Sequence, residues 1–202
     1  MQTLLTWKNM ALAGLGIVLV VIAAVVVARQ MGGAPTARLI RELQDPDDDV
    51  RQEAAKALGE LGPLAKEAVP SLVAALQDSD SKVRYRALKA LSKIGVAEKS
   101  AVPALTSLLQ DNDRDVRYYS AKMLSKMGRD AAPALEALTR SLADRDPEIR
   151  YYVVKSLGEI GPDARSAVPA LQKAARADDP RVREIAVSSI RKIDRSQVAS
   201  PR

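Results

Sequence analysis

The sequence predicts an all-α protein in which five copies of a two-helix unit, an α-solenoid, follow one transmembrane helix. Three observations predict this fold class. A residue pattern recurs every 33 positions through most of the 202-residue chain. The apolar residues are mainly alanine, leucine and valine, without phenylalanine, and this composition suits packed helices better than sheets. One uncharged apolar stretch of 19 residues lies near the N-terminus.

That stretch, residues 10–28, is followed by Arg29 and preceded by a short N-terminal segment, residues 1–9. At 1.5 Å per residue, 19 residues rise about 30 Å, which is the thickness of the hydrocarbon core of a bilayer. Trp7 and Lys8 on one side and Arg29 on the other are typical interfacial anchors. The sequence therefore predicts a transmembrane helix over residues 10–29. A cleaved signal peptide is the alternative, with an unusually long apolar region and poor cleavage sites.

Residues 30–36, which contain Gly32, Gly33 and Pro35, are expected to form a linker. The repeat array is expected over residues 37–194, and residues 195–202 are expected to form a polar tail. Basic residues on the two sides of the span nearly balance, so the positive-inside rule favours a cytoplasmic array only slightly.

The second helix of each unit has a recognisable beginning and end. An aspartate three residues before the first apolar residue is the expected N-cap, and a glycine is expected to end the helix in a left-handed conformation. The aspartates are Asp47, Asp80, Asp113, Asp146 and Asp179. The apolar residues are Val50, Val83, Val116, Ile149 and Val182. The glycines are Gly62, Gly95, Gly128 and Gly161, and the fifth unit has Asp194 instead.

The first helix of each unit contributes a leucine to the predicted core, and most begin at a proline. The leucines are Leu39, Leu72, Leu105, Leu138 and Leu171. The fourth unit has Glu136 at the usual proline position and Pro133 nearly one turn earlier, so its first helix is expected to start a turn sooner.

Segments such as AVPSLVAALQDSDSKVRYRALKALSKIG resemble HEAT repeats, and among them the subclass named for phycobilisome lyases. The shared segments are A-V-P-x-L, D-x-D-x-x-V-R and A-L-x-x-[IL]-G. The resemblance implies a scaffold or interaction module, with bilin attachment or iron-dependent hydroxylation in a minority of members. The chain has no histidine, so the hydroxylase motif is missing, and no motif for bilin attachment can be mapped.

Catalytic, metal and cofactor sites are not expected. Histidine and cysteine are both absent, which removes the commonest general base, the thiolate nucleophile and two metal ligands. The net charge of +6 favours acidic partners or anionic surfaces without requiring either.

The candidate partner-binding residues lie on the second helices of the three central units. At 100° per residue, the position two after the first apolar residue points away from the core, and so does the position four further on. These positions are occupied by Tyr85 and Lys89, Tyr118 and Lys122, and Tyr151 and Lys155, and Lys93 and Lys126 extend the basic strip. In a HEAT-like array they would line the concave face. Tyrosine beside lysine suits an interface with acidic groups.

Other interpretations of these residues remain open. The tyrosines could reflect only the duplication that produced the repeat, and Tyr119 and Tyr152 are expected to pack between units. The arginine after each apolar residue is expected to pair with a capping aspartate of its own or an adjacent unit. The predicted function is a membrane-anchored, non-enzymatic scaffold for a protein partner or a membrane-complex subunit. The alternatives are binding of nucleic acid or anionic lipid, or a bilin-lyase-like accessory role.

Overall fold

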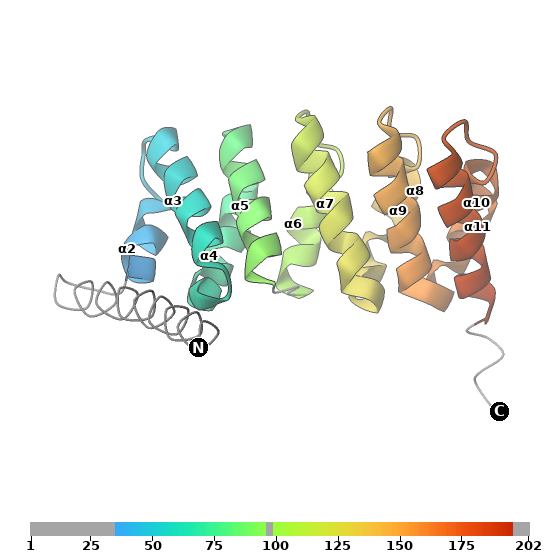
Figure 1. Ribbon diagram of the computed structural model, residues 1–202, viewed down its shortest axis with the longest axis horizontal. Helices are drawn as coiled ribbons and strands as arrows, with labels where there is room; N and C mark the ends of the chain where they lie inside the picture. The colour runs from blue at the N-terminus through green and yellow to red at the C-terminus, as the bar shows by residue number, and fades with distance from the viewer. Residues whose placement is uncertain (1–34, 96–98, 196–202) are drawn as a thin grey trace, which may run out of the picture.

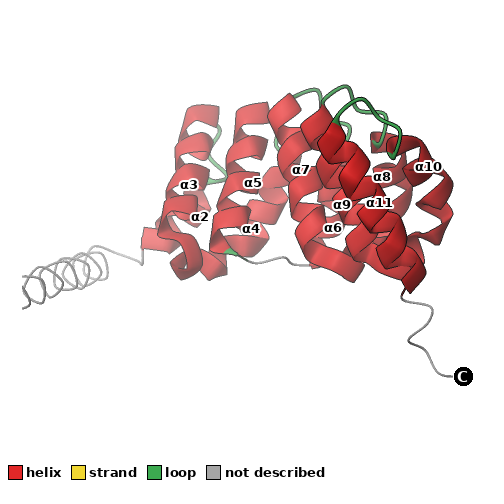
Figure 2. Ribbon diagram, turned by 45° about the vertical axis from the view of Figure 1, so that its right-hand side comes forward, coloured by secondary structure: helices red, strands yellow, loops and turns green. Residues whose placement is uncertain are grey.

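The computed structural model describes residues 35–95 and 99–195, and every regular element within these ranges is a helix. The helices form two layers that run the length of the molecule (Figure 1). One layer holds the second helices of the five units, which lie side by side in chain order in both views (Figures 1 and 2). The first helices lie behind them. The predicted solenoid of five two-helix units is therefore confirmed.

The second helices are the longer ones. They are α3 (Asp48–Leu61), α5 (Ser81–Ile94), α7 (Arg114–Met127), α9 (Pro147–Ile160) and α11 (Pro180–Arg195). The first helices are α2 (Pro35–Glu42), α4 (Val69–Ala74), α6 (Val102–Leu108), α8 (Leu135–Ser141) and α10 (Val168–Ala174). Short 3₁₀ segments lie within or between the units: η1 (Gly62–Ala68), η2 (Ala75–Gln77), η3 (Lys99–Ala101), η4 (Gly128–Ala134) and η5 (Gly161–Ala167). We number the units 1 to 5 along the chain.

The expected early start of the fourth first helix is wrong. Helix α8 begins at Leu135, which corresponds after one period to Val102 at the start of α6. Pro133 lies inside η4, the 3₁₀ segment that precedes α8. A proline in this segment therefore leaves the register of the following helix unchanged.

The predicted N-caps are confirmed in all five units. The side chain of Asp113, for example, accepts hydrogen bonds from the backbone N–H groups of Asp115 and Val116. The glycine ends differ in detail from the expectation. Gly95 has the left-handed conformation, whereas Gly128 combines φ 58° with ψ −129° and leads directly into η4. A side chain would strain either backbone.

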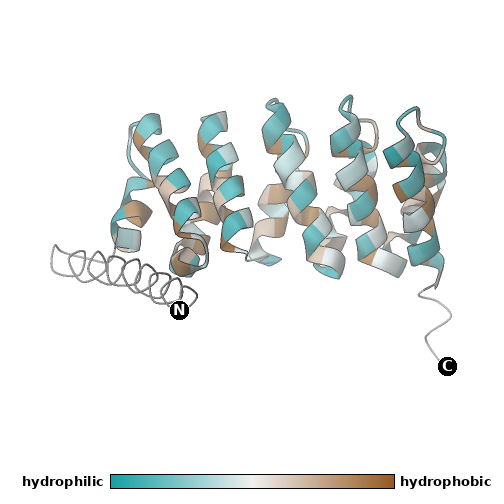
Figure 3. Cartoon of the chain, viewed as in Figure 1, coloured by the Kyte–Doolittle hydropathy of each residue, from teal (hydrophilic) through white to brown (hydrophobic). Residues whose placement is uncertain are grey.

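The core lies between the two layers and contains leucines from both. Four of the five predicted first-helix leucines are fully buried, and Leu39 at the N-terminal end is half-buried. Along each helix, hydrophobic and hydrophilic residues alternate, as amphipathic packing requires (Figure 3). Because each unit also buries apolar surface against its neighbours, the five units share one continuous core.

Three of the five recurring arginines bind an aspartate of the next unit, but not the capping one. Arg84 donates from Nε and NH2 to Asp111, two residues before the cap Asp113, at 2.8 and 2.9 Å. The same pairing joins Arg51 to Asp78 and Arg117 to Asp144. The expectation that the arginine pairs with a capping aspartate is therefore wrong. The first aspartate of the D-x-D segment accepts hydrogen bonds from the arginine, and the second, two residues later, caps the helix.

Within the ranges that the structure describes, no helix is long and apolar enough to cross a bilayer. The span predicted over residues 10–29 lies outside those ranges, as do most of the linker and most of the C-terminal tail.

Candidate functional site

The predicted tyrosines lie on the layer of second helices, which we call the second-helix face. Tyr85, Tyr118 and Tyr151 occupy equivalent places on α5, α7 and α9. Each ring is half-buried and packs against the edge of the core, so these side chains do not point straight away from it as helical periodicity predicts. The rings of Tyr85 and Tyr118 each contact a ring of the next unit.

The five tyrosines form one continuous line of edge-to-face contacts, which we call the tyrosine row. Its order is Tyr85, Tyr119, Tyr118, Tyr152 and Tyr151, and successive ring centres are 5.2–5.4 Å apart. Each such contact typically contributes about 0.5–1.5 kcal/mol beyond burial. The prediction that Tyr119 and Tyr152 pack between units is confirmed.

Burial raises the pKa of Tyr119 above the ordinary value for a phenol, and the neighbouring Tyr85 adds to the increase. Burial likewise raises the pKa of Tyr152, with a further contribution from its hydrogen bond with Tyr118. Both hydroxyls are therefore protonated and uncharged at neutral pH. The tyrosine row is a neutral, partly apolar strip.

The predicted lysines border this strip, and two of them lie over its rings. Lys89 Nζ is 5.6 Å from the ring centre of Tyr85. Lys122 Nζ lies 5.5 Å from the ring centre of Tyr118 and 5.7 Å from those of Tyr119 and Tyr152. Cation–π attraction at these distances holds the ammonium groups beside the rings.

The remaining predicted lysines are less closely tied to the tyrosines. Lys155 is half-buried on α9, and Lys93 and Lys126 are exposed on α5 and α7. Lys93 lines a small hollow between α3 and α5, together with Lys56, Arg86 and Lys89. These four cations and the single carboxylate of Glu60 make this end of the second-helix face basic.

Acidic and basic residues that the sequence did not single out surround the C-terminal half of the row. Arg114 stacks 5.2 Å from the centre of the Tyr118 ring and donates to Asp146 and Glu148 of the next unit. The hydrogen bond to Asp146 is the main reason why the pKa of Arg114 is raised. Arg114 therefore joins units 3 and 4 alongside the rings.

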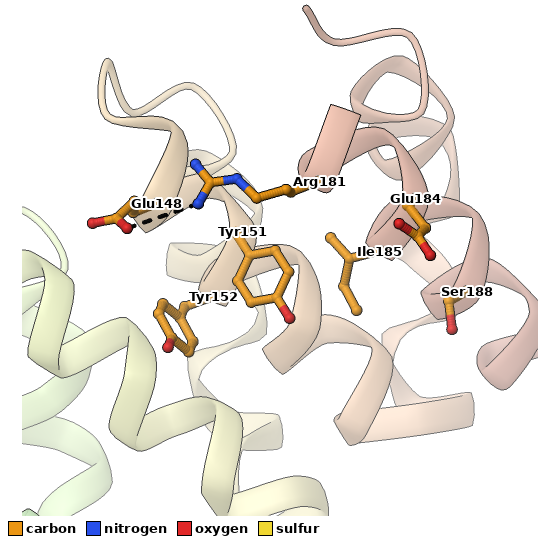
Figure 4. Close-up of a pocket in the computed structure, with 7 residues that line it drawn as sticks. All are labelled: Glu148, Tyr151, Tyr152, Arg181, Glu184, Ile185 and Ser188. Atoms are coloured by element: carbon orange, nitrogen blue, oxygen red, sulfur yellow. Dashed lines mark ion pairs between the residues drawn. The ribbon is translucent and has the colours of Figure 1, made fainter. Parts of the chain in front are cut away.

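The tyrosine row ends in a hollow of about 500 Å³ between α9 and α11. Figure 4 shows the ring of Tyr151 facing this space, with Ile185, Glu184 and Ser188 on the far wall. Arg181 crosses above it, with NH1 3.9 Å from Glu148.

The hollow arises from a break in the repeat. Tyr85 contacts Tyr119 and Tyr118 contacts Tyr152, each 34 residues on. The residue 34 after Tyr151 is Ile185, which has no ring. At the other end of the row, the position beside Tyr85 is filled by Arg86, whose guanidinium lies 5.7 Å from the ring centre. One end of the row is therefore covered by a cation and the other has space for a further ring.

Among the residues of the described ranges, no cluster of three or more carboxylates is placed to hold a metal ion. The second-helix face offers apolar rings, cations and a shaped hollow, which can bind a partner through contact and charge.

The fold and this face define a helical repeat protein. The HEAT repeats family matches residues 36–101, 95–143 and 135–201, and the chain belongs to that family. No curated protein sequence gives a significant match.

Several solved structures are similar. An engineered protein is 26% identical with a TM-score of 0.67, covering 86% of this chain and 84% of that one. The complex of CpcE and CpcF of phycocyanin lyase from Nostoc sp. is 28% identical with a TM-score of 0.63, covering 82% and 67%. A designed armadillo repeat protein in complex with the peptide (KR)4 shares the fold at 20% identity and a TM-score of 0.66, covering 77% and 80%.

Proposed function

We propose that this protein is a membrane-anchored, non-enzymatic scaffold that binds an extended segment of a partner protein on the concave side formed by the second helices. The observation that carries the proposal is the open hollow at the end of the tyrosine row. Residues 10–29 supply the anchor, and the partner is a protein such as a subunit of a membrane complex. A slight excess of positive charge after the span favours a cytoplasmic array.

The chemistry of the face suggests what such a segment carries. An aromatic side chain fits beside Tyr151, where it would continue the edge-to-face contacts of the row. Acidic side chains suit Lys155, Lys122 and Lys89, which follow one another on successive units. Packed helices are about 10 Å apart and an extended chain rises about 3.3 Å per residue, so acidic residues would recur at roughly every third position.

Repeat folds of this kind bind partners along their length, and two similar structures are complexes. The phycocyanin lyase subunits were solved together, and the designed armadillo protein was solved with a peptide. These neighbours support a binding role for the solenoid and leave the identity of the partner open.

The test uses the full chain in mild detergent and a fluorescent peptide with one tyrosine followed by glutamates at every third position. Ile185→Tyr fills the hollow with a ring of the protein itself, so it should weaken binding about tenfold, the equivalent of losing one well-packed ring. Lys122→Glu should weaken it further by reversing a charge.

Leu64→Ser provides the matched control, because Leu64 is 77% exposed on η1 and belongs to neither the tyrosine row nor the hollow. This variant should bind the peptide as the wild type does. Ile185→Tyr should also unfold at the same temperature as the wild type or higher. Unchanged affinity of Ile185→Tyr for the peptide would refute the proposed use of the hollow.

The lysines beside the rings also favour a second candidate, binding of nucleic acid or anionic lipid. Phosphate contacts release counterions, so the logarithm of the binding constant for single-stranded RNA or for vesicles containing phosphatidylserine would fall steeply with the logarithm of salt concentration. The peptide also binds through the uncharged contact of its ring in the hollow, so its affinity should fall less steeply with salt. A salt titration with each probe therefore separates the two candidates.

The similarity to phycocyanin lyase favours a third, a bilin-lyase-like accessory role. Incubation of the purified chain with a bilin, followed by absorbance spectroscopy of the repurified protein, tests it. Retained bilin absorbance that Ile185→Tyr abolishes would place the chromophore in the hollow.

A further inference from the structure

In units 1 to 3, the arginine that follows the first apolar residue of the second helix makes two kinds of contact. Its NH1 group donates to two backbone carbonyls of the preceding loop: Arg84 to Asp78 and Ser79, and Arg117 to Asp111 and Asn112. Its remaining N–H groups face the next unit, where Nε and NH2 of Arg84 donate to both carboxylate oxygens of Asp111. The loop contacts thus fix the guanidinium with a carboxylate-binding edge turned outward.

Arg150 in unit 4 keeps the first kind of contact and lacks the second. Its NH1 donates to the carbonyls of Asp144 and Arg145 at 2.8 and 3.1 Å, as in the other units. The aspartate that would meet its outer edge is replaced by Ala177. Among the described residues, no carboxylate forms an ion pair with Arg150. The guanidinium is therefore held in a carboxylate-binding orientation without a carboxylate.

A hollow of about 310 Å³ lies beside Arg150, between units 4 and 5. It exists because small residues replace larger ones. Ala143 and Ala174, which line it, stand where the preceding unit boundary has Gln110 and Ser141, and those two side chains are hydrogen-bonded to each other at 3.0 Å. The loss of these side chains, together with the missing aspartate, leaves the space open.

The lining of this hollow is cationic and aliphatic. Arg150 and Lys173 are its charged residues, and neither Asp nor Glu lines it. The rest of the wall includes Leu142, Val154 and Val182. A guanidinium presents its N–H groups in a planar fork that matches a carboxylate, so the expected ligand is anionic and planar at one end and apolar at the other.

We propose that Arg150 and Lys173 form a binding site for an aliphatic carboxylate. The carboxylate takes the place that Asp111 and Asp144 occupy at the other unit boundaries, and its carbon chain lies against the aliphatic wall. The group can come from a free short-chain acid or from a glutamate side chain of a partner. This site lies between the last two units and is distinct from the hollow beside Tyr151.

Arginine Nε resonances of the full-length protein in detergent provide the test. Butyrate represents the free acid and N-acetylglutamate amide represents the side chain, each titrated at constant ionic strength with chloride as the balancing anion. The Arg150 Nε signal should move saturably, with a dissociation constant in the millimolar range that is usual for such small ligands. The Arg84 signal should not move, because Asp111 already fills its fork.

Ala177→Asp restores the missing carboxylate and is the decisive variant. The backbone at Ala177 already accepts from Arg183 NH1 at 2.9 Å, as the backbone of Asp144 accepts from Arg150, so the new side chain should reach the fork. The Arg150 signal of this variant should move toward those of the paired arginines and lose its response to both probes, while the melting temperature rises.

Saturation by butyrate alone would assign the site to a free acid, and saturation by the amide alone would assign it to a partner side chain. Equal responses of Arg150 and Arg84, no saturable response of Arg150 to either probe, or an undiminished response in Ala177→Asp would each overturn the proposal.

Discussion

The pair between Arg117 and Asp144 allows a quantitative test of how the units are joined. Arg117 is 6% exposed, and its Nε donates to Asp144 at 2.8 Å across the boundary between units 3 and 4. The other oxygen of Asp144 accepts from the backbone N–H of Asp146 at 2.9 Å. Asp144→Ala therefore leaves a buried guanidinium without its counter-ion and a helix N-terminus without one of its acceptors.

Breaking a buried pair from one side costs about 3–5 kcal/mol, and a lost backbone hydrogen bond costs about 1 kcal/mol. For a protein of this size, 1 kcal/mol corresponds to about 2–4 °C, so the melting temperature should fall by roughly 10 °C or more. Thermal unfolding followed by circular dichroism at constant detergent concentration measures it. Asp163→Ala, at an exposed position of η5, is the control and should change stability by less than about 0.5 kcal/mol.

The double variant Arg117→Met/Asp144→Ala decides whether the charge is the cause. Replacing both members of a buried pair by apolar groups is often nearly neutral, so the double variant should be more stable than Asp144→Ala alone. A decrease of less than 2 °C for the single variant, or a double variant less stable than the single one, would refute the reasoning.

Two further predictions concern packing and pH. A Cβ atom at Gly158 would lie 2.4 Å from Ser189 Oγ and 3.0 Å from Ser189 Cα, so Gly158→Ala should force α9 and α11 apart and cost about 1–3 kcal/mol in chemical denaturation. Because Ser189→Gly also removes the hydrogen bond from Ser189 Oγ to Val154 O, the comparison is made within that background. Gly158→Ala should cost less in Ser189→Gly than in the wild type, and an equal cost would exclude the clash. Burial raises the pKa of Asp78, but hydrogen bonds from Arg51 and from the Asp80 N–H outweigh it, and the net pKa lies below the ordinary value. A lowered pKa in the folded state stabilises the fold above about pH 4 and ceases to do so as the pH falls further. Asp78→Asn should therefore flatten the dependence of melting temperature on pH below pH 4, and an unchanged acid slope would contradict this.

The fold was predictable because the same local signals recur in every unit. Capping aspartates such as Asp113 and glycines such as Gly95 mark the ends of second helices, and the 33-residue period places the leucines in one core. The arginine partners were harder to predict because two aspartates compete in each D-x-D segment. Only the structure shows that the first one, as in Asp111, reaches across to the preceding unit.

The candidate site was predicted in its residue types but not in its geometry. Helical periodicity placed Tyr118 opposite the core because it treats each helix alone. The structure shows that a neighbouring ring, that of Tyr152, covers part of it. The two hollows are visible in the sequence only as departures from the repeat, Ile185 for a tyrosine and Ala177 for an aspartate, and these become meaningful once the contacts at the other boundaries are known.

Both departures fall at the same boundary. The ring contact and the arginine–aspartate bridge that join units 2, 3 and 4 are missing between units 4 and 5, where Ile185 and Ala177 stand instead. In a linear array, stability is a sum of terms for the units and for their interfaces, so the interface between units 4 and 5 lacks two of the terms that the two preceding interfaces have. A ligand bound in either hollow would contact both units and so add a link between them. The array would then bend less easily at this boundary when a ligand is bound than when none is.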